Sequence, residues 1–449
     1  MIVTARYSLR KELSVSTLPR GLVVFCLVSF ASLVTGSAAV ALLAAIVALV
    51  VMVNCEDADN FCFSLFLIPN IRLLDVSGIS FLVNALILSP LFIFIFRKRK
   101  VNKFALVFTF GLLAYELLHE LIFSQYSDLV ANAASVLTLL YAWSFSTDRD
   151  VGVDPYRAAE YLALGIIASS VLYLLSNPLY ARHLIDDIVS GERFEAFADD
   201  PNYFACYICV ALAVILCSRL SNTRIIPLAL AMIGIGFLTN SKMELLVSFT
   251  LVIIWAINVI AKFDSKQRRT ALILSGCLLF FSFLFSGTLF ELLNRLIVRA
   301  GLNSGQLNMA KLSTGRSTIL GDYVSLFTND PVALIYGYGL DYYPALLQVG
   351  ATVDHYAHNT YFDVVASWGV VGLVVVCAAL VQWFSELSAT WKSPSREAVR
   401  KLPAIVLAVC IFSLSCLSSS MFWLLVAVVS MVIWKEPVEH EVLDNRPGL

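Results

Sequence analysis

The sequence predicts an all-α protein, a polytopic bundle of transmembrane helices with a large polar loop inserted among them. Three observations predict this class. The chain has 449 residues, of which 59% are hydrophobic and 14% are charged, whereas about 25% are charged in a typical soluble domain. Its mean hydropathy is +0.83. Its apolar residues form long runs, and its basic residues cluster between those runs.

The long apolar runs are the candidate membrane spans. A helix needs about 20 apolar residues to cross a bilayer, with a range of roughly 17 to 25. By this length criterion we predict about fourteen spans, with about twelve as the lower limit. They cover residues 20–36, 37–53, 59–72, 77–96, 102–123, 128–146, 157–176, 201–219, 225–240, 241–261, 270–287, 358–386, 401–416 and 419–435.

The basic clusters orient these spans. Lysine and arginine concentrate in the cytoplasmic loops of membrane proteins. Four basic clusters fall on one side of the bilayer in the predicted count, and they lie within residues 6–20, 97–103, 262–269 and 392–401. The same count places both termini in the cytoplasm. In a bacterial inner membrane, the two long loops at residues 177–200 and 288–357 would then lie in the periplasm.

No fixed-period repeat and no linker divides the chain, so residues 1–449 are interpreted as a single integral membrane domain. Residues 288–357 form an inserted loop subdomain in this interpretation. Apolar residues between Phe290 and Ile297 recur at helical spacing and predict a short interfacial helix. A second helix should begin near Arg316 and end by Pro331, because proline disfavours helical geometry in the residue before it.

A tyrosine-rich turn follows this second predicted helix. It contains Tyr336, Tyr338, Tyr342 and Tyr343, separated in part by glycines. Tyrosine combines a flat apolar face with a hydroxyl group, which suits stacking on sugar rings. The same chemistry suits the aromatic belt at a membrane surface. These residues alone do not decide between the two interpretations.

Two residues of the large loop are candidates for chemistry. His358 stands where the loop meets the next apolar run, as either an interfacial side chain or an acid–base group. His355 and His358 have a spacing found in zinc sites, but no third ligand follows at matching spacing, so we predict no metal. Arg316 suits anion binding, since a guanidinium and helix N-terminal amides both donate to phosphate. A solvated loop arginine is the alternative.

Two further cations lie at the predicted outer ends of spans. Arg193 precedes the run 201–219, where it could contact a ligand or pair with Glu192 or Glu195. Lys242 stands in a tight turn between two spans. A lysine whose amino group simply reaches up to the membrane surface would explain that position equally well.

Two acidic clusters point to other classes of function. Glu116, His119 and Glu120 share one helix face within a span and would fit the proton relay of a transporter, such as a polysaccharide flippase. Asp57 and Asp59 are interpreted mainly as a solvated helix cap, with the carboxylate pair of a metal-dependent glycosyltransferase as the alternative. The net charge of −1 and the lack of a DNA- or RNA-binding motif predict no nucleic-acid partner.

Four short motifs, taken in chain order, resemble the O-antigen polymerase and O-antigen ligase superfamily of bacterial envelope glycosyltransferases. They are Arg193 with Asp200-Pro201-Asn202-Tyr203, Thr239-Asn240-Ser241-Lys242, Gly315-Arg316, and His358-Asn359-Thr360-Tyr361 leading to Gly369 and Gly372. The resemblance covers about residues 190–385. This family usually has arginine at the position of Lys242, and lysine keeps the charge but loses the bidentate fork for phosphate.

The resemblance implies a metal-independent transfer of glycan, without a cofactor, from undecaprenyl diphosphate to a hydroxyl group of another lipid-linked glycan. A polymerase of repeat units is the expected activity, and ligation of the glycan to a lipid A core is the alternative. The implied partners are the two lipid-linked glycans and the bilayer, and a chain-length regulator protein is a further candidate.

The resemblance also implies roles for individual residues. His358 and Arg316 would be catalytic, and Arg316 would bind the diphosphate together with Arg193 and Lys242. His358 would take a proton from the attacking hydroxyl group or donate a hydrogen bond to the diphosphate. The glycan would be contacted by Asn202, Tyr203, Asn359 and the tyrosine-rich turn, and Asn359 would orient His358.

Overall fold

The computed structural model describes residues 2–75, 82–123, 129–151, 153–190, 192–198, 200–217, 222–262, 316–340, 342, 358–391, 398–417, 419 and 421–434. Within these ranges the protein is all-helical, and no strand is present. The elements are α1 (Ile2–Thr35), α2 (Ala38–Asn54), α3 (Asp57–Leu67), η1 (Ile68–Asn70), α4 (Leu82–Phe96), α5 (Lys103–Phe123), α6 (Leu129–Thr147), α7 (Pro155–Ser176), α8 (Pro178–Ser190), α9 (Pro201–Leu216), α10 (Asn222–Leu238), α11 (Lys242–Lys262), α15 (Arg316–Asn329), α16 (Pro331–Tyr336), α18 (Thr360–Trp391), η3 (Ala398–Lys401), α19 (Leu402–Ile411) and α20 (Met421–Trp434).

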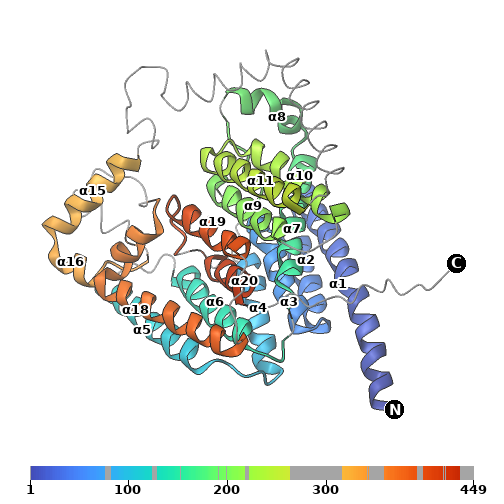
Figure 1. Ribbon diagram of the computed structural model, residues 1–449, viewed down its shortest axis with the longest axis horizontal. Coiled ribbons are helices and arrows are strands. Elements are labelled where there is room, and N and C mark those ends of the chain that lie inside the picture. Colours follow the sequence, from blue (N-terminus) through green and yellow to red (C-terminus); the bar gives the residue numbers. More distant parts are fainter. Residues whose placement is uncertain are drawn as a thin grey trace.

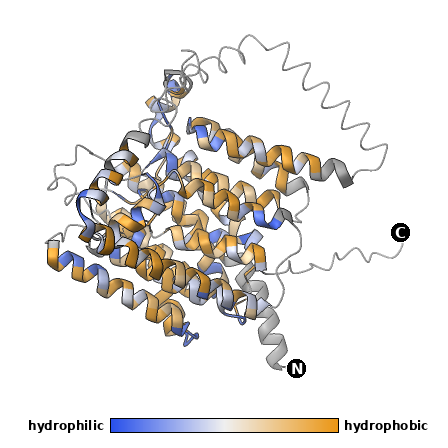
Figure 2. Cartoon of the chain, turned by 60° about the vertical axis from the view of Figure 1, so that its left-hand side comes forward, coloured by the Kyte–Doolittle hydropathy of each residue, from blue (hydrophilic) through white to orange (hydrophobic). Residues whose placement is uncertain are grey.

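Four of the described helices are long and apolar enough to cross a membrane. These are residues 18–35 of α1, residues 103–122 of α5, all of α7 and all of α18. Shorter apolar helices of 10–17 residues accompany them, α2, α4, α9, α19 and α20 among them. Figure 2 shows that hydrophobic residues cover most of the length of the helices, while hydrophilic residues gather near their ends. The predicted membrane protein class is confirmed.

Two predicted spans form shorter helices than expected. The run 59–72 corresponds to α3, whose 11 residues rise only about 17 Å, against a hydrocarbon core of about 30 Å. The run 401–416 corresponds to α19, whose 10 residues rise about 15 Å. The run 270–287 lies outside the described residues. The total of about fourteen spans therefore stays a prediction.

The second predicted loop helix has the predicted bounds, because α15 extends from Arg316 to Asn329. Asp330 separates it from α16, and its carboxylate caps α16 by accepting hydrogen bonds from the N–H groups of Val332 and Ala333, both at 3.1 Å. The predicted interfacial helix at residues 290–297 lies outside the described residues, and the loop subdomain as a whole stays a prediction.

A backbone break divides α18 into two parts. Gly369 has φ 64° and ψ −169°, outside the helical range. A side chain at this position would overlap the main chain of Ile335, and one at Gly337 would overlap the main chain of Ser367. Glycine at both positions therefore allows α16 to approach α18 closely, and Figure 1 shows α15 and α16 on the flank of the bundle next to the start of α18.

Helix α18 defines two ends of the bundle. At its start, the Thr360 hydroxyl group donates to Leu414 O at 2.6 Å. Near its other end, Glu386 accepts a hydrogen bond of 2.6 Å from the Asn102 amide, next to the segment that carries Arg97. Thr360 and Glu386 are separated by most of the length of α18, and the break at Gly369 lies between them. We call these two regions the His358 end and the Arg97 end.

Candidate functional site

The start points of three helices meet at the connection between α19 and α20, residues 412–417, which we call the 412–417 loop. The Tyr203 hydroxyl group at the start of α9 donates to Ser415 O. The Ser413 hydroxyl group donates to the sulfur of Met243, in the first turn of α11, at 2.9 Å. At the start of α18, the Thr360 Oγ1 accepts from Cys416 N at 3.0 Å. The loop thus joins three of the four sequence motifs that are distant along the chain.

Arg193 is held by two of these motifs. Its Nη2 donates to Asn202 Oδ1 at 2.7 Å, and its Nε donates to Thr239 O at 3.3 Å. The neighbouring residue Phe194 also donates its N–H to Leu238 O at 3.2 Å. Two neutral acceptors therefore contribute to the orientation of the guanidinium. The alternative of a pair with Glu192 or Glu195 stays a prediction.

The turn that carries Lys242 has a constrained backbone. Asn240 has φ 53°, in the left-handed region, and its side-chain amide donates to Ile188 O and Glu192 O at 3.2 and 3.3 Å. Lys242 is half-buried at the first position of α11. The turn is thereby attached to the segment that carries Arg193, so the structure brings Arg193 and Lys242 to the same region.

His358 lies directly before α18 in a left-handed conformation, with φ 48°, and its side chain is half-buried. Asn359 follows it and is only 2% exposed. The Asn359 Oδ1 accepts from the N–H groups of Tyr361 and Phe362 at 3.0 and 3.3 Å, which makes Asn359 the N-cap of α18. These contacts give Asn359 a structural role, and its predicted contact with glycan stays a prediction.

Arg316 is the first residue of α15, the position that its predicted role in anion binding requires. Gly315 and the Arg316 side chain lie outside the described residues. Asn202 and Tyr203 have structural partners, since Asn202 Oδ1 accepts from Arg193 and the Tyr203 hydroxyl group donates to the 412–417 loop. Their predicted contacts with glycan are untested.

The tyrosine-rich turn is largely buried, which differs from the prediction that it lines a glycan site. Tyr338 and Tyr342 are 5% and 1% exposed. The Tyr338 hydroxyl group donates to Asp330 Oδ2 at 2.9 Å, and that of Tyr342 donates to Asp363. Burial, reinforced by these carboxylates, raises the pKa of both tyrosines. Packing leaves little of either ring accessible to a sugar.

Tyr336 is the exposed member of this turn, with 53% of its surface accessible. Tyr343 lies outside the described residues. The buried tyrosines instead form the core of a small unit with α15 and α16, in which the Tyr323 and Tyr342 rings meet edge-to-face with centroids 5.9 Å apart. Of the described members of the turn, Tyr336 is the one whose exposure fits a glycan contact.

The cluster that suggested a proton relay binds the main chain of the large loop. Glu116 accepts hydrogen bonds from Leu340 N at 2.8 and 3.1 Å and from the Trp368 indole at 2.9 Å. His119 Nδ1 and Nε2 lie 2.8 and 2.9 Å from the carbonyl oxygens of Tyr115 and Tyr336. The Glu116 and His119 side chains therefore attach the segment Tyr336–Leu340 to α5.

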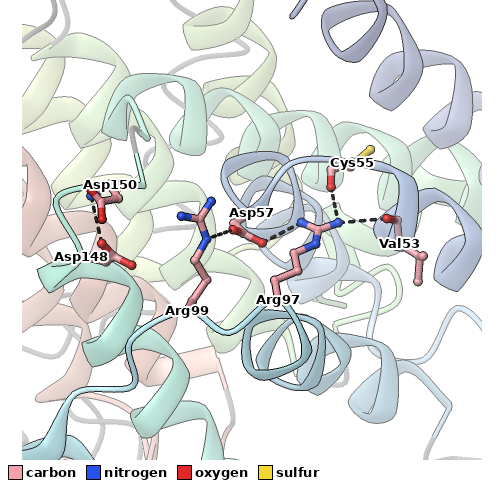
Figure 3. Close-up of polar contacts among 7 residues, drawn as sticks. All are labelled: Val53, Cys55, Asp57, Arg97, Arg99, Asp148 and Asp150. Carbon is pink, nitrogen blue, oxygen red and sulfur yellow. Dashed lines mark hydrogen bonds and ion pairs between the residues drawn. The ribbon is translucent and has the colours of Figure 1, made fainter. Parts of the chain in front are cut away.

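The acidic pair that suggested a metal site lies at the Arg97 end. Asp57 Oδ1 is 2.7 Å from Arg97 Nη1 and its Oδ2 is 2.7 Å from Arg99 Nε, and Figure 3 shows Asp57 between the two guanidinium groups. Asp59 pairs with Arg157 at 2.7 Å. Both carboxylates are buried, at 4% and 3% exposure, so the solvated cap that we predicted is wrong. Arginines occupy the positions that a cation would need.

No group of three or more potential metal ligands is present in the part of the chain that the structure describes. Three helices begin at the His358 end, and the N-terminal end of a helix carries partial positive charge. Arg193, Lys242 and His358 lie near these starts. Carboxylates lie in the same helix starts, namely Asp200, Glu244 and Asp363.

The 412–417 loop was missed by the sequence analysis. Residues 412–416 lie at the end of the predicted span 401–416, and residue 417 lies in the short gap before the predicted span 419–435. The signal that could have revealed it is the cluster of small polar residues in Ser413-Leu-Ser-Cys-Leu-Ser-Ser-Ser420, which interrupts the apolar pattern. Polar residues at membrane depth tend to face protein or a cavity.

Comparison with known families decides the wider identity of the chain. Residues 227–377 match the O-antigen ligase family. This match supports the O-antigen polymerase and ligase superfamily for the chain. Neither curated proteins nor solved structures give a match. The matched region includes Lys242, Arg316 and His358, and it ends within α18.

The superfamily assignment fixes the broad type of activity. The protein is a membrane enzyme of the O-antigen ligase and polymerase type, whose members are glycosyltransferase-like proteins of glycan assembly. Arg193 and the start of α9 precede the matched region, and tertiary contacts connect them to it. The site is therefore wider than the region that the family comparison covers.

Proposed function

We propose that this protein is a glycosyltransferase that polymerises oligosaccharide repeat units carried on undecaprenyl diphosphate. The observation that carries the proposal is the joining of the Arg193, Lys242 and His358 segments through the 412–417 loop, within a chain that matches the O-antigen ligase family. A site that combines cations with a histidine suits a donor with an anionic leaving group.

The chemistry of the donor explains the need for cations. When a hydroxyl group attacks the anomeric carbon, the bond to the diphosphate oxygen breaks and negative charge builds on the leaving group. Fixed cations at that point stabilise the transition state more than the ground state. In this proposal Arg193, Lys242 and Arg316 bind the diphosphate, and neither a metal nor a cofactor is required.

His358 acts on the other side of the same reaction. It takes the proton from the attacking hydroxyl group, or it donates a hydrogen bond to the diphosphate. General-base assistance typically contributes about 10² to 10⁴ in rate. Asn359 supports either role, because its cap fixes the first turn of α18 directly after His358. Tyr336 is the candidate for contact with the acceptor glycan.

A ligase is the second candidate function, and the match to the O-antigen ligase family favours it. In that case the acceptor would be a hydroxyl group of a lipid A core. The donor, the cationic site and the histidine would have the same roles. The two functions differ in the acceptor alone.

The proposed setting is a bacterial inner membrane, with both termini in the cytoplasm and the His358 end at the periplasmic face. The four basic clusters support this orientation, since they fall on one side of the predicted span count. A chain-length regulator protein is a proposed partner of the polymerase.

The test uses purified protein in lipid vesicles with lipid-linked repeat units, and chain length is followed on gels. A ladder of products that forms in EDTA and disappears in the His358→Ala and Arg316→Ala variants would support the polymerase. Transfer to added lipid A core without a ladder would identify the ligase. Full activity of His358→Ala, or complete dependence on a divalent cation, would contradict the proposed mechanism.

A further inference from the structure

The segment Tyr336–Leu340 is held between two helices at the His358 end. On one side, the N–H groups of Tyr338 and Gly339 donate to Ala366 O and Ser367 O of α18 at 2.8 and 2.7 Å. In an unbroken helix these two carbonyls would accept from residues 370 and 371. The break at Gly369 interrupts the regular helix there, and the loop segment supplies donors to both carbonyls.

On the other side, α5 binds the same segment through three side chains. The Glu116 carboxylate accepts from Leu340 N with both oxygens, at 2.8 and 3.1 Å. The Tyr115 hydroxyl group donates to Tyr336 O at 2.8 Å, and His119 Nε2 lies 2.9 Å from the same oxygen. Glu116 is 1% exposed, so its contacts with Leu340 are shielded from water.

Glu116 is the centre of this attachment, because it binds α18 and the loop segment at once. Its Oε2 accepts from Trp368 Nε1 at 2.9 Å, and Trp368 directly precedes the break at Gly369. The Asn132 amide of α6 donates to Oε1 at 3.2 Å. A single carboxylate therefore joins the loop segment to α18 and α6.

The attached segment carries the loop residues that belong to the proposed site. Tyr338 and Tyr342 pack with Tyr323 of α15 and Ala366 of α18 in one small core. Helix α15 begins at Arg316. We call α15, α16 and residues 337–340 and 342 the loop unit. Its position relative to α18 determines where Arg316 lies relative to His358.

We infer that Glu116 is a positioning residue, which holds the loop unit against α18 so that Arg316 and His358 act on the same donor. The inference rests on the proposed glycosyl transfer. In this inference the Glu116, His119 and Tyr115 side chains hold the loop unit in place, and they do not form a proton relay. A misplacement of about 1 Å in a catalytic constellation can reduce the rate about 100-fold, so a change at Glu116 acts on turnover although Glu116 touches no substrate.

The first measurement is independent of activity. Nitroxide labels, introduced through a genetically encoded keto amino acid at the exposed positions Val324 of α15 and Leu117 of α5, report the distance between the loop unit and the bundle. We expect one narrow distance distribution in the otherwise unchanged protein. Glu116→Ala should broaden or shift it, and Trp368→Phe, which removes one donor and keeps the aromatic packing, should have a smaller effect.

The second measurement is the transfer reaction with lipid-linked repeat units. We expect Glu116→Ala to lower kcat about 100-fold and to change the donor KM by no more than about twofold, because Glu116 does not bind the donor. Glu116→Gln keeps one acceptor oxygen for Leu340 N, so its kcat should lie between that of Glu116→Ala and that of the unaltered protein. This graded response would not follow from general destabilisation alone.

The matched control is Glu386→Gln at the Arg97 end. Glu386 also accepts from an indole and an asparagine amide, Trp143 Nε1 at 2.7 Å and Asn102 Nδ2 at 2.6 Å, but it lies far from the loop unit. Its variant should keep the distance distribution and kcat. An unchanged distribution in Glu116→Ala, or a changed distribution with unchanged kcat, would overturn the inference. An unaltered protein that transfers no glycan would overturn the proposed function, while the distance measurement still decides whether Glu116 holds the loop unit.

Discussion

The Arg97 end and the His358 end of α18 treat charged side chains differently. At the Arg97 end, Asp57 and Asp59 form ion pairs of 2.7 Å with three arginines. At the His358 end, the Arg193 guanidinium is oriented by an amide oxygen and a main-chain carbonyl, and Glu116 is bound by neutral N–H groups. The contacts described for Asp57 and Asp59 are ion pairs, whereas those described for Arg193 and Glu116 are hydrogen bonds with neutral groups, which fix the position of each charged side chain.

This difference teaches how to separate structural from functional charge in a membrane protein. An ionisable group within a span is costly and is a candidate for function by default. At the Arg97 end Asp57 and Asp59 each have an arginine partner, and the ion pairs connect α3 to the end of α4 and to α7. We therefore expect substitutions there to affect stability, and substitutions at the His358 end to affect turnover.

The largest expected effect is that of His358→Ala. Loss of a general base should reduce transfer by about 10² to 10⁴, with little change in the thermal unfolding midpoint, because the side chain is only half-buried. Transfer assays and thermal unfolding in detergent measure the two quantities. His183→Ala, in an exposed histidine of α8, is the control and should retain activity. A stable, fully active His358→Ala variant would contradict the expectation that the His358 end carries the chemistry.

Arg193 tests whether geometry matters beyond charge. Arg193→Lys keeps the charge but loses the planar fork that reaches Asn202 and Thr239. The loss of one hydrogen bond from a charged group, about 1.5–3 kcal/mol, should reduce kcat/KM about 10- to 100-fold. Lys242→Arg makes the reverse exchange, from lysine to arginine. It should keep activity within about twofold, since arginine is usual at this position in the family. Equal activity of both variants would show that charge alone suffices.

Asp57→Asn tests the structural half of the comparison. It leaves Arg97 and Arg99 without their shared carboxylate, which should lower the free energy of unfolding by roughly 2–3 kcal/mol, less than for a fully buried pair because both arginines are partly exposed. Chemical denaturation measures this loss. Asp150→Asn, an exposed neighbour in the same view (Figure 3), should stay within about 0.5 kcal/mol. A loss of transfer activity in a stable Asp57→Asn variant would contradict the division of roles.

The smallest expected effect is that of pH on the loop unit through Asp330. The N–H group of Ala333, the Tyr338 hydroxyl group and the N–H group of Val332 lower the pKa of Asp330 below its usual 3.8. A lowered pKa stabilises the folded state above the unfolded value, and this contribution disappears as the pH falls through the folded value. Asp330→Asn should therefore be slightly less stable than the natural protein near pH 6, and this difference should shrink below pH 4. Thermal unfolding at several pH values measures it, and a difference that grows in acid would contradict the assignment.

Several features could be predicted because they depend on local sequence. Apolar runs of membrane length predicted the class, and Asn329-Asp330-Pro331 predicted the end of α15, since proline restricts the residue before it. The four motifs also predicted the superfamily that the comparison with known families found. In each case the physical cause acts within about one helix length of the residues that carry the signal.

Burial and pairing could not be predicted in the same way. The sequence showed tyrosines in a polar loop, but it did not show that Asp363 of a later helix would accept from Tyr342. Asp57 read as a solvated residue because its partners Arg97 and Arg99 lie about 40 residues further along the chain. The contact between Glu116 and Leu340 spans 224 residues, a separation at which no spacing rule applies.

The sequence by itself therefore determined the membrane class, most helix positions and the superfamily, since hydrophobicity and helix propensity are properties of short segments. Only the tertiary structure decided which of the described contacts of charged side chains are ion pairs and which are hydrogen bonds with neutral groups. It placed the arginines of one end against carboxylates, and it gathered the starts of α9, α11 and α18 around the 412–417 loop. The physical reason is that the energy of a charge depends on what surrounds it, and those surroundings come from helices that are distant in sequence.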